Sequence, residues 1–232
     1  EMYIAGIYEL LNIPYTGNHS WTLGTLIRKS KVKDLLKQFG YLTPSYQVLY
    51  DLENIELNKN LKFPLIVKPS REDASVGINN SSIVNSVEEI KKQAIYVYNL
   101  VKQPVMVEEY IAGRELNVAV LGNSNPEVLP ISEIDFSELP EELPKIVTYS
   151  AKWHGESPEY KGTKGICPAA LNPSTEESLK KISREVYKLF DCRGYVRVDF
   201  RLSEKDEPYI LEINPNPDIS ADAGFFRSAK NA

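Results

Sequence analysis

The segment "EPYILEINPNPDIS", Glu207 to Ser220, places a carboxylate and an amide inside a run of residues that favours a β-strand, and prolines follow directly. Side chains alternate between the two faces of a strand. Alternation predicts Tyr209, Leu211 and Ile213 on one face and Ile210, Glu212 and Asn214 on the other. The two polar side chains therefore project together. A lone glutamate here would indicate only a partly exposed edge strand.

The preceding segment "GYVRVDFRL", Gly194 to Leu202, alternates in the same way. Its expected faces are Val196, Val198 and Phe200 on the apolar side and Arg197, Asp199 and Arg201 on the polar side. The polar connector "SEKDE" is short enough for a hairpin. If the connector has an even number of residues, Asp199 lies opposite Glu212 and Arg197 lies opposite Asn214.

Two carboxylates that face each other across a strand pair repel, so a cation is expected between them. A hard divalent metal such as Mg²⁺ suits two carboxylates and an amide oxygen. The alternative is an ion network in which Arg197 and Arg201 neutralise the carboxylates. The two strands alone leave both interpretations open.

The composition is typical of a soluble globular protein: 232 residues, 42% hydrophobic and 25% charged. No apolar run approaches the ~18 residues of a membrane span, and no leader segment is visible, so we expect a cytoplasmic protein. A net charge of −5 argues against broad binding to nucleic acid or to anionic membranes. The two cysteines, Cys167 and Cys192, are expected to be core or loop thiols.

Five helices are expected along the chain. The first spans the first twelve residues, with an apolar stripe of Ile4, Ile7, Leu10 and Leu11. Two follow with Ser20 and Ser30 as N-caps, and the second of these ends at Gly40. Further helices are expected from the capping box at Ser86 to about Val101, and from about Thr175 to Phe190.

Strands fill the remaining apolar segments and are expected to form largely antiparallel sheets. The expected strands are Ser45 to Tyr50, Phe63 to Lys68, Ser82 to Val84, two around Ala112-Gly113, Val128 to Ile134, Ile146 to Tyr149, Gly194 to Leu202 and Pro208 to Asn214.

Phosphate-binding loops of the common kinds are absent. "GTLIRKS", Gly24 to Ser30, resembles a P-loop but has Arg28 where the second glycine must stand, and no GxGxxG occurs. A better candidate is "FPLIVKPSREDASVGI", where an apolar strand carries Lys68 into a polar loop that ends at Gly77. A lysine buried at that strand end would need an anion.

Five segments together resemble the ATP-grasp part of D-alanine:D-alanine ligases, over nearly the whole chain. They are "FPLIVKPSREDASVGI", "VEEYIAGREL", "YSAKW", "CPAAL" and "GYVRVDFRL" with "PYILEINPNPD". The resemblance implies an α+β fold in which two lobes clasp ATP between antiparallel sheets. It places the small lobe at residues 29–107 and the large lobe, with the metal site, at residues 108–232. Residues 1–28 are expected to be the remnant of an N-terminal domain or linker.

The resemblance implies an ATP site. Lys29 and Lys68 would hold the phosphates, and Ser75 and Val76 would belong to the loop that closes over them. Glu108, with the backbone of Glu109 and Ile111, would contact the adenine edge. Tyr110 and Leu211 would flank the adenine faces, and Glu115 would accept hydrogen bonds from the ribose.

It also implies a metal site and a catalytic site. Asp199, Glu212 and Asn214 match the ligands of Mg²⁺ (or Mn²⁺). Arg197 matches the arginine that stabilises the transferring phosphoryl group, and Lys152 would reach the γ-phosphate. Asp218 lies in the loop that receives the tetrahedral oxyanion, and we expect it to contact substrate.

Several positions depart from the family pattern. Ala74 stands where the ligases usually have a serine that latches the mobile loop, and Trp153 stands where a tyrosine usually completes that latch. Asp218 replaces a glycine, and Ala223 stands about where a serine holds the carboxylate of the second amino acid. Arg28 replaces an aspartate before the first phosphate lysine. These departures concern closure of the loop and D-alanine as acceptor.

The function implied is that of an ATP-dependent carboxylate–amine ligase, which acts through an acyl phosphate on amino acids or related small metabolites. Two alternatives remain: a nucleotide-binding module without ligase activity, and D-alanine:D-alanine ligase proper. The expected cofactors are ATP and Mg²⁺. The expected partners are small-molecule substrates and possibly a second copy in a homodimer, without nucleic acid or membrane.

Overall fold

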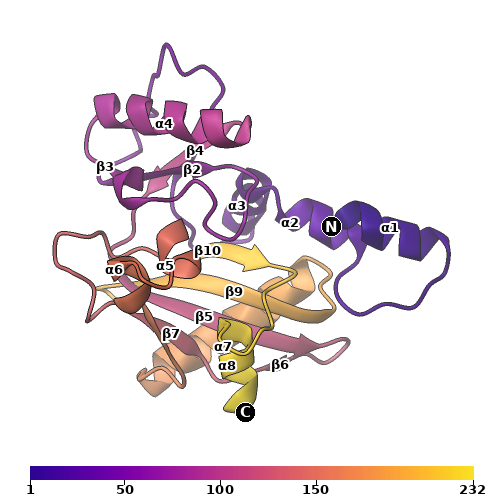
Figure 1. The fold of residues 1–232 in the computed structure, drawn as a ribbon. Coiled ribbons are helices and arrows are strands. Elements are labelled where there is room, and N and C mark those ends of the chain that lie inside the picture. The colour runs from indigo at the N-terminus through magenta and orange to yellow at the C-terminus, as the bar shows by residue number, and fades with distance from the viewer. The chain divides into compact units, whose positions relative to one another are not determined.

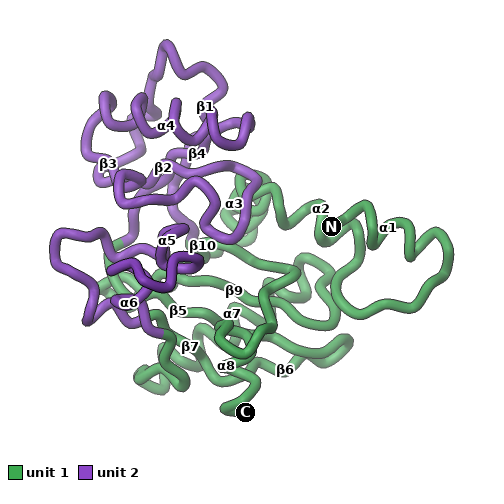
Figure 2. The backbone as a smooth tube through the Cα atoms, viewed as in Figure 1, with its two compact units in different colours: residues 1–42, 112–134, 165–232 green, residues 43–111, 135–164 purple.

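The computed structural model describes all 232 residues and divides into two compact units. Unit 1 comprises residues 1–42, 112–134 and 165–232, and unit 2 comprises residues 43–111 and 135–164 (Figure 2). The two units and the two expected lobes are divided at different residues, because the first 42 residues group with unit 1. The assignment of residues 1–28 to a remnant domain stays a prediction.

Unit 1 is built on a six-stranded sheet with the order β10-β9-β5-β7-β8, and β6 pairs with β5. Its strands are β5 (Gly113–Gly122), β6 (Glu127–Val128), β7 (Ser132–Asp135), β8 (Lys164–Ile166), β9 (Gly194–Ser203) and β10 (Pro208–Asn214). The pairs β5–β9, β5–β7 and β9–β10 are antiparallel, as predicted. Gly113 is required where β5 begins: its φ is +135°, and a Cβ there would lie 2.0 Å from the Leu202 carbonyl oxygen.

One face of this sheet is covered by α7 (Pro173–Leu189), as Figure 1 shows. Asn172 caps this helix, since its side chain accepts a hydrogen bond from the Thr175 N–H at 2.8 Å. Leu179 and Val186 on α7 pack against Val196, Val198 and Phe200 on β9, which confirms the predicted apolar face of β9. The other face of the sheet carries the polar residues of β9, and α8 (Gly224–Lys230) packs there through Phe225.

The hairpin of β9 and β10 contains a β-bulge that the sequence did not predict. Near the turn, Ile210 pairs with Phe200, but beyond Leu211 the register shifts and Glu212 pairs with Asp199. Two consecutive residues of β10 therefore oppose one residue of β9, which reverses the alternation of faces at this point.

This bulge corrects the predicted faces of β10. Ile210 and Ile213 both lie in the core, and Leu211 and Glu212 are both only half-buried. The predicted pairing of Asp199 with Glu212 and of Arg197 with Asn214 is confirmed, but by a different route: the turn does not have the parity we assumed, and the bulge supplies the missing shift of one residue.

Three helices at the start of the chain complete unit 1: α1 (Met2–Leu10), α2 (Ser20–Leu26) and α3 (Lys29–Gln38). The predicted apolar stripe of α1 is exposed, and Ala5 is the one buried residue of this helix. The N-cap positions of α2 and α3 are His19 and Arg28, so the prediction of Ser20 and Ser30 is wrong. Neither residue caps its helix through a side-chain hydrogen bond, so the pattern of capping side chains does not indicate where these two helices begin.

Unit 2 contains a four-stranded sheet with the order β1-β4-β2-β3. Its strands are β1 (Tyr46–Leu49), β2 (Leu65–Pro69), β3 (Ile83–Val84) and β4 (Val105–Glu109). The helix α4 (Val87–Val101) packs on this sheet through Ile90, Ala94 and Val97. The predicted cap is confirmed, because the Ser86 hydroxyl accepts a hydrogen bond from the Glu89 N–H.

The second segment of unit 2 carries α5 (Tyr149–Trp153) and α6 (Pro158–Lys161), and a 3₁₀ turn, Asn80–Ser82, lies in the first segment. The predicted strand Ile146 to Tyr149 is wrong. Thr148 caps α5 by accepting a hydrogen bond from the Ala151 N–H at 3.1 Å, which starts a helix where strand residues were expected. No helix in either unit is both long and apolar enough to cross a bilayer.

Candidate functional site

Paired carboxylates lie at the centre of the β9–β10 hairpin in unit 1. Asp199 and Glu212 are register partners, and Arg197 pairs with Asn214 one step along the strands. The guanidinium of Arg197 binds both carboxylate oxygens of Asp199, with Nε to Oδ1 at 2.7 Å and Nη2 to Oδ2 at 2.8 Å. This bidentate geometry is the strongest form of an arginine–carboxylate pair.

The second carboxylate has its own cation. Lys29, in the first turn of α3, donates from Nζ to Glu212 Oε1 at 2.9 Å and is itself buried. Asp199 is thus paired with Arg197, the predicted catalytic cation, and Glu212 is paired with Lys29, a predicted phosphate-binding cation. The repulsion between Asp199 and Glu212 is compensated by Arg197, which the alternative interpretation included, and by Lys29, which it did not.

The field of these carboxylates acts on Arg197. Burial by itself would lower the pKa of this guanidinium, but the charges of Asp199, Glu212 and Glu115 outweigh burial and raise the pKa above its ordinary value. Arg197 is therefore a permanent cation beside the position predicted for the transferred phosphoryl group.

Two supporting residues were missed by the sequence analysis. Asn117 on β5 donates from Nδ2 to Asp199 Oδ1 at 2.8 Å, the oxygen that also accepts from Arg197 Nε, and so helps to orient the carboxylate. The buried Arg201 binds Glu115 Oε2 at 2.9 Å, so the predicted ribose acceptor is held by its partner on β9. An amide inside the apolar run "LNVAVL" was the signal that could have indicated Asn117.

The residues predicted to hold Mg²⁺ fit that ion. Asp199, Glu212 and Asn214 present oxygen donors on adjacent rungs of one hairpin, which is the chemistry a hard divalent cation requires. Asn214 Oδ1 accepts a hydrogen bond from the Asn216 N–H at 2.9 Å, which fixes the amide so that a second lone pair on the oxygen remains. No group of three His, Cys, Asp or Glu side chains is placed to hold a metal, so the third ligand would have to be the amide.

Unit 2 holds the other predicted nucleotide residues, and its central feature is a buried ion pair. Lys68 on β2 donates from Nζ to Glu108 Oε1 on β4 at 2.5 Å, and the Glu108 side chain is 2% exposed. The anion that the burial of Lys68 requires is therefore present within the protein. The two residues are not register partners: Lys68 pairs with Met106 and Glu108 pairs with Ile66, so the side chains meet diagonally.

At the end of β4, one backbone group that was predicted to contact adenine is already hydrogen-bonded within the protein. The N–H of Glu109 donates to the Ser45 carbonyl at 2.9 Å, and the N–H of Tyr110 donates to the Pro64 carbonyl at 3.1 Å. The Glu109 N–H is already engaged, so this residue has only its carbonyl to offer an adenine ring. Ile111 is the last residue of this segment of unit 2.

The loop that contains Ser75 and Val76 is held to the second segment of unit 2. Ala74 and Ser75 both have φ in the left-handed region, +54° and +59°. The Ser75 hydroxyl donates to the Val147 carbonyl at 2.8 Å, and the Trp153 indole N–H donates to the Ala74 carbonyl at 3.3 Å. A latch is therefore present despite Ala74, because a backbone carbonyl accepts from the tryptophan. Lys152, the predicted γ-phosphate contact, is exposed on α5 beside Trp153.

Leu211 lies in the middle of β10, and Asp218 lies in the loop that follows the strand. Leu211 is the bulge residue, half-buried beside Glu212. Asp218 follows in the loop after β10, where its carboxylate accepts from the Ser220 N–H at 2.8 Å and from the Ser220 hydroxyl at 2.6 Å. Unit 1 thus brings together Lys29, Glu115, Arg197, Asp199, Glu212 and Asn214, and unit 2 holds Lys68, Ser75, Val76, Glu108, Glu109, Tyr110, Ile111 and Lys152.

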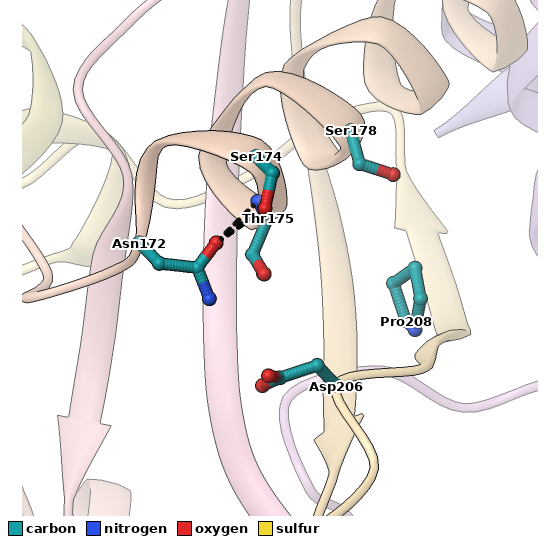
Figure 3. A pocket seen from close by; sticks show the side chains of 6 residues that line it. All are labelled: Asn172, Ser174, Thr175, Ser178, Asp206 and Pro208. Atoms are coloured by element: carbon teal, nitrogen blue, oxygen red, sulfur yellow. Dashed lines mark hydrogen bonds between the residues drawn. The ribbon is translucent and has the colours of Figure 1, made fainter.

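A shallow pocket of about 290 Å³ lies elsewhere on unit 1, between the start of α7 and the β9–β10 turn (Figure 3). It is lined by Asn172, Ser174, Thr175, Ser178, Asp206 and Pro208. Asn172 turns toward the first turn of α7, where it caps the helix. None of the predicted site residues lines this pocket, so its shape carries no evidence about the chemistry.

Comparison with known protein families decides what kind of chain this is. Residues 35–232 match the family described as "D-ala D-ala ligase C-terminus". The chain belongs to this family.

Individual relatives agree with the family assignment. The D-alanine–D-alanine ligase of Carboxydothermus hydrogenoformans is 34% identical over 235 residues, which cover 98% of this chain and 70% of that ligase. The uncharacterized protein y4sG of Sinorhizobium fredii is 32% identical over 230 residues, which cover 99% of this chain and 65% of y4sG. The chain thus spans about two thirds of the length of these relatives.

Solved structures give the fold. The chain resembles the D-alanine–D-alanine ligase from Bacillus anthracis complexed with ATP, with a TM-score of 0.77 and 25% identity over 98% of this chain and 67% of that one. It also resembles the VanG D-Ala:D-Ser ligase from Enterococcus faecalis, with a TM-score of 0.76 at 23% identity. The predicted α+β ATP-grasp fold is confirmed.

Proposed function

We propose that the protein is an ATP-dependent carboxylate–amine ligase that acts on amino acids or related small metabolites through an acyl phosphate. The observation that carries this proposal is the hairpin of unit 1, where Asp199 and Glu212 face each other and each is matched by a cation, Arg197 or Lys29. Such a site can stabilise negative charge that develops and is redistributed during a reaction, which is what phosphoryl transfer requires.

The chemistry explains the residue types. A substrate carboxylate attacks the γ-phosphorus of ATP, and the acyl phosphate that forms is displaced by an amine to give an amide, phosphate and ADP. Attack of one anion on another is repulsive, so fixed cations must offset the charge that develops. Arg197, held bidentately by Asp199, is oriented for this role, and Lys152 is the second candidate.

The remaining residues would bind the nucleotide and its metal. Mg²⁺ at Asp199, Glu212 and Asn214 would neutralise phosphate charge when bound. Lys29 and Lys68 would contact the phosphates, and each would then exchange part of its present ion pair for the ligand. Glu108, the Glu109 carbonyl, Tyr110, Ile111 and Leu211 would surround the adenine, and Glu115 would accept from the ribose. The loop of Ser75 and Val76 would cover the phosphates.

The family pattern leaves the identity of the amine substrate open. Asp218 and Ala223 stand where the ligases usually have a glycine and a serine, which argues against D-alanine as acceptor. The retained cations argue against a nucleotide-binding module without activity, and the Trp153–Ala74 hydrogen bond shows one way in which a loop can be held without the usual serine.

We further propose that the protein works in the cytoplasm on small molecules, without nucleic acid or membrane, and as a homodimer. The negative net charge of −5 supports the first part, because a polyanionic partner would be repelled. In this proposal residues 29–107 and 108–232 act as the two lobes that enclose ATP, and residues 1–28 connect to a preceding domain.

The test is mass spectrometry of products made by the full-length protein with Mg-ATP and a pool of D- and L-amino acids. The expected result is ADP together with a new mass equal to two pool members less one water. ADP without a new product would indicate that one substrate lies outside the pool. Neither ADP nor product, with ATP still bound, would contradict the ligase proposal and favour the binding module.

A further inference from the structure

Asn18, in the segment between α1 and α2 of unit 1, is a buried residue whose side-chain nitrogen and oxygen both have partners. It is 2% exposed. Its Nδ2 donates to the Pro215 carbonyl at 2.6 Å and to the Tyr195 carbonyl at 3.1 Å. Its Oδ1 accepts from the Arg193 N–H at 2.8 Å. The two N–H donors and the oxygen of the amide are therefore used to tie the start of the chain to β9 and to the loop after β10.

The loop after β10 depends on such contacts, because it has few backbone donors. Proline has no N–H, so the Asn216 N–H, between Pro215 and Pro217, is the one backbone donor of these three residues. That N–H donates to Asn214 Oδ1 at 2.9 Å. Pro215 also cannot donate in a sheet ladder, and β10 ends at Asn214. This part of the loop is therefore held mainly through its carbonyls and side chains.

The Pro215 carbonyl and the Asn216 N–H belong to one peptide group. This group is planar, and its C=O and N–H bonds point in opposite directions because it is not one of the cis peptides of the chain. Asn18 therefore binds one edge of the peptide group, and the Asn214 side chain binds the other edge. Rotation of the group would break both hydrogen bonds at once. A hydrogen bond accepted by the carbonyl also polarises the N–H and strengthens its donation.

We propose that Asn18 is a positioning residue for the predicted Mg²⁺ site, and that it acts on Asn214 through the peptide group between Pro215 and Asn216. The inference rests on the proposed function, in which Asn214 Oδ1 is the third ligand of the metal. The Asn216 N–H fixes that oxygen, and Asn18 fixes the N–H. Loss of a group that holds a metal ligand in place typically weakens metal binding by about 10- to 100-fold.

Thr22 on α2 gives a matched control, because it makes the same kind of contact at a different place. It is 1% exposed, and its hydroxyl donates to the Phe190 and Asp191 carbonyls at 3.2 and 3.1 Å. Thr22→Val and Asn18→Leu each replace a buried donor to backbone carbonyls with an apolar side chain of similar size, so we expect both to lower stability. Of the two, Asn18→Leu alone frees the peptide group that orients Asn214.

Metal binding is measured without turnover, with Mn²⁺ as the probe because it accepts the same oxygen ligands. Electron paramagnetic resonance follows the loss of the free Mn²⁺ signal as the full-length protein and ADP are added. We expect Asn18→Leu to weaken Mn²⁺ binding about tenfold and Thr22→Val to leave it unchanged. The affinity for ADP without metal should be the same in wild type and in both variants.

Solvent-exchange NMR gives a second readout that does not involve the metal. We expect the Asn216 N–H to exchange roughly fivefold faster in Asn18→Leu than in wild type, because the opposite edge of its peptide group has lost a hydrogen bond. The Ser203 N–H, which donates to the Glu207 carbonyl in the turn of the same hairpin, should not change. Thr22→Val should leave both rates as they are in wild type.

Three results would overturn the inference. One is that Asn18→Leu binds Mn²⁺ and ADP as tightly as wild type. Another is that Thr22→Val weakens metal binding as much as Asn18→Leu, which would assign the loss to general destabilisation. The third is an Asn216 exchange rate that does not change in Asn18→Leu.

A second variant covers the case in which Asn18→Leu does not fold. Asn18→Ser keeps a hydroxyl that can serve one of the two carbonyls, and it is compared with Thr22→Val by the same two readouts. Metal binding that depends on Asn18, without ligase activity in the wild-type protein, would support the inference and count against the ligase function.

Discussion

Each unit contains ion pairs at its predicted site, but the pairs differ in burial and in what could replace them. In unit 1, Glu212 is half-buried and its lysine partner comes from a helix 183 residues away. In unit 2, Lys68 and Glu108 are both buried between adjacent strands of the sheet, at 2.5 Å. The pairs differ in the carboxylate, because Glu212 is partly exposed and Glu108 is buried, while both lysines are buried. A pair with a partly exposed carboxylate can exchange a partner for a ligand at smaller cost than a fully buried pair, which loses much of its stabilisation if one partner leaves.

The difference suggests a division of work. The hairpin of unit 1 is suited to bind a charged ligand, because the cations paired with its carboxylates can exchange these partners for the ligand. The pair in unit 2 is better suited to hold the sheet together and to present a fixed charge pattern to a ligand.

The strongest test removes one carboxylate from the exchangeable site. We expect Asp199→Asn to lower Mg²⁺-dependent ATP turnover by about 10²-fold or more, because both the metal ligand and the anchor of Arg197 are lost. Turnover and Mg²⁺-dependent nucleotide binding are measured together. Asp206→Asn is the matched control, since it makes the same chemical change in the turn of the same hairpin. Unchanged Mg²⁺ dependence in Asp199→Asn would rule out the metal site.

The fixed pair is tested by stability. We expect Lys68→Met to lower the free energy of unfolding of unit 2 by about 3–5 kcal/mol, because Glu108 is left as a buried charge. Unfolding in urea is followed by the fluorescence of Trp153 in a Trp21→Phe background, which leaves one tryptophan. The double variant Lys68→Met/Glu108→Leu should recover most of the loss. If the double variant is as unstable as the single one, the cost comes from packing and not from the unpaired charge.

A smaller effect is expected at the loop of unit 2. Trp153→Phe removes the indole hydrogen bond to the Ala74 carbonyl, which contributes about 1 kcal/mol and should speed local amide exchange roughly fivefold. The reporters are the N–H groups of Val76 and Ile78, which donate to Asp73 and Ser75 within the loop. Trp21→Phe, at an exposed tryptophan of unit 1, should leave these rates unchanged. Equal rates in Trp153→Phe and wild type would mean that the loop is held without this contact.

The smallest effect concerns an exposed carboxylate of unit 1 outside the site. The Ser20 hydroxyl, Tyr15 and the Ser20 N–H donate to Glu9 and lower its pKa from 4.5 to about 2. Because the folded-state pKa is depressed, the associated stability is present above pH 4.5 and is lost as the pH falls toward 2. An NMR titration should place the midpoint of the Glu9 carboxyl well below 4.5 in wild type and closer to 4.5 in Ser20→Ala. A midpoint that does not move would exclude the hydroxyl as the main cause.

The hairpin of unit 1 was predictable because its information is local. A period of two and a short connector, with an assumed parity of the turn, placed Asp199 opposite Glu212. The bulge at Leu211 was not predictable, since no residue type there demands it. It puts Ile210 on the same face as Ile213, although simple alternation places them on opposite faces. The correct register was therefore reached from a wrong assumption about the turn.

The rest of the site depends on contacts that no local pattern encodes. Lys29 finds Glu212 across 183 residues, and Asn18 finds the Pro215 carbonyl across 197 residues. The sequence also does not predict the left-handed backbone at Ala74 and Ser75, because neither residue type favours that conformation. The resemblance to a known family supplied roles for many of these residues, but not their contacts.

The interleaved course of the chain has a consequence for synthesis on the ribosome. The chain crosses between the units after residues 42, 111, 134 and 164. All four strands of the unit 2 sheet have emerged by Glu109, whereas β5 must wait for β9, which begins only at Gly194. Short-range contacts form earlier than distant ones. A nascent chain arrested between these points would already contain the Lys68–Glu108 pair, and Glu115 and Asn117 would still lack their partners on β9.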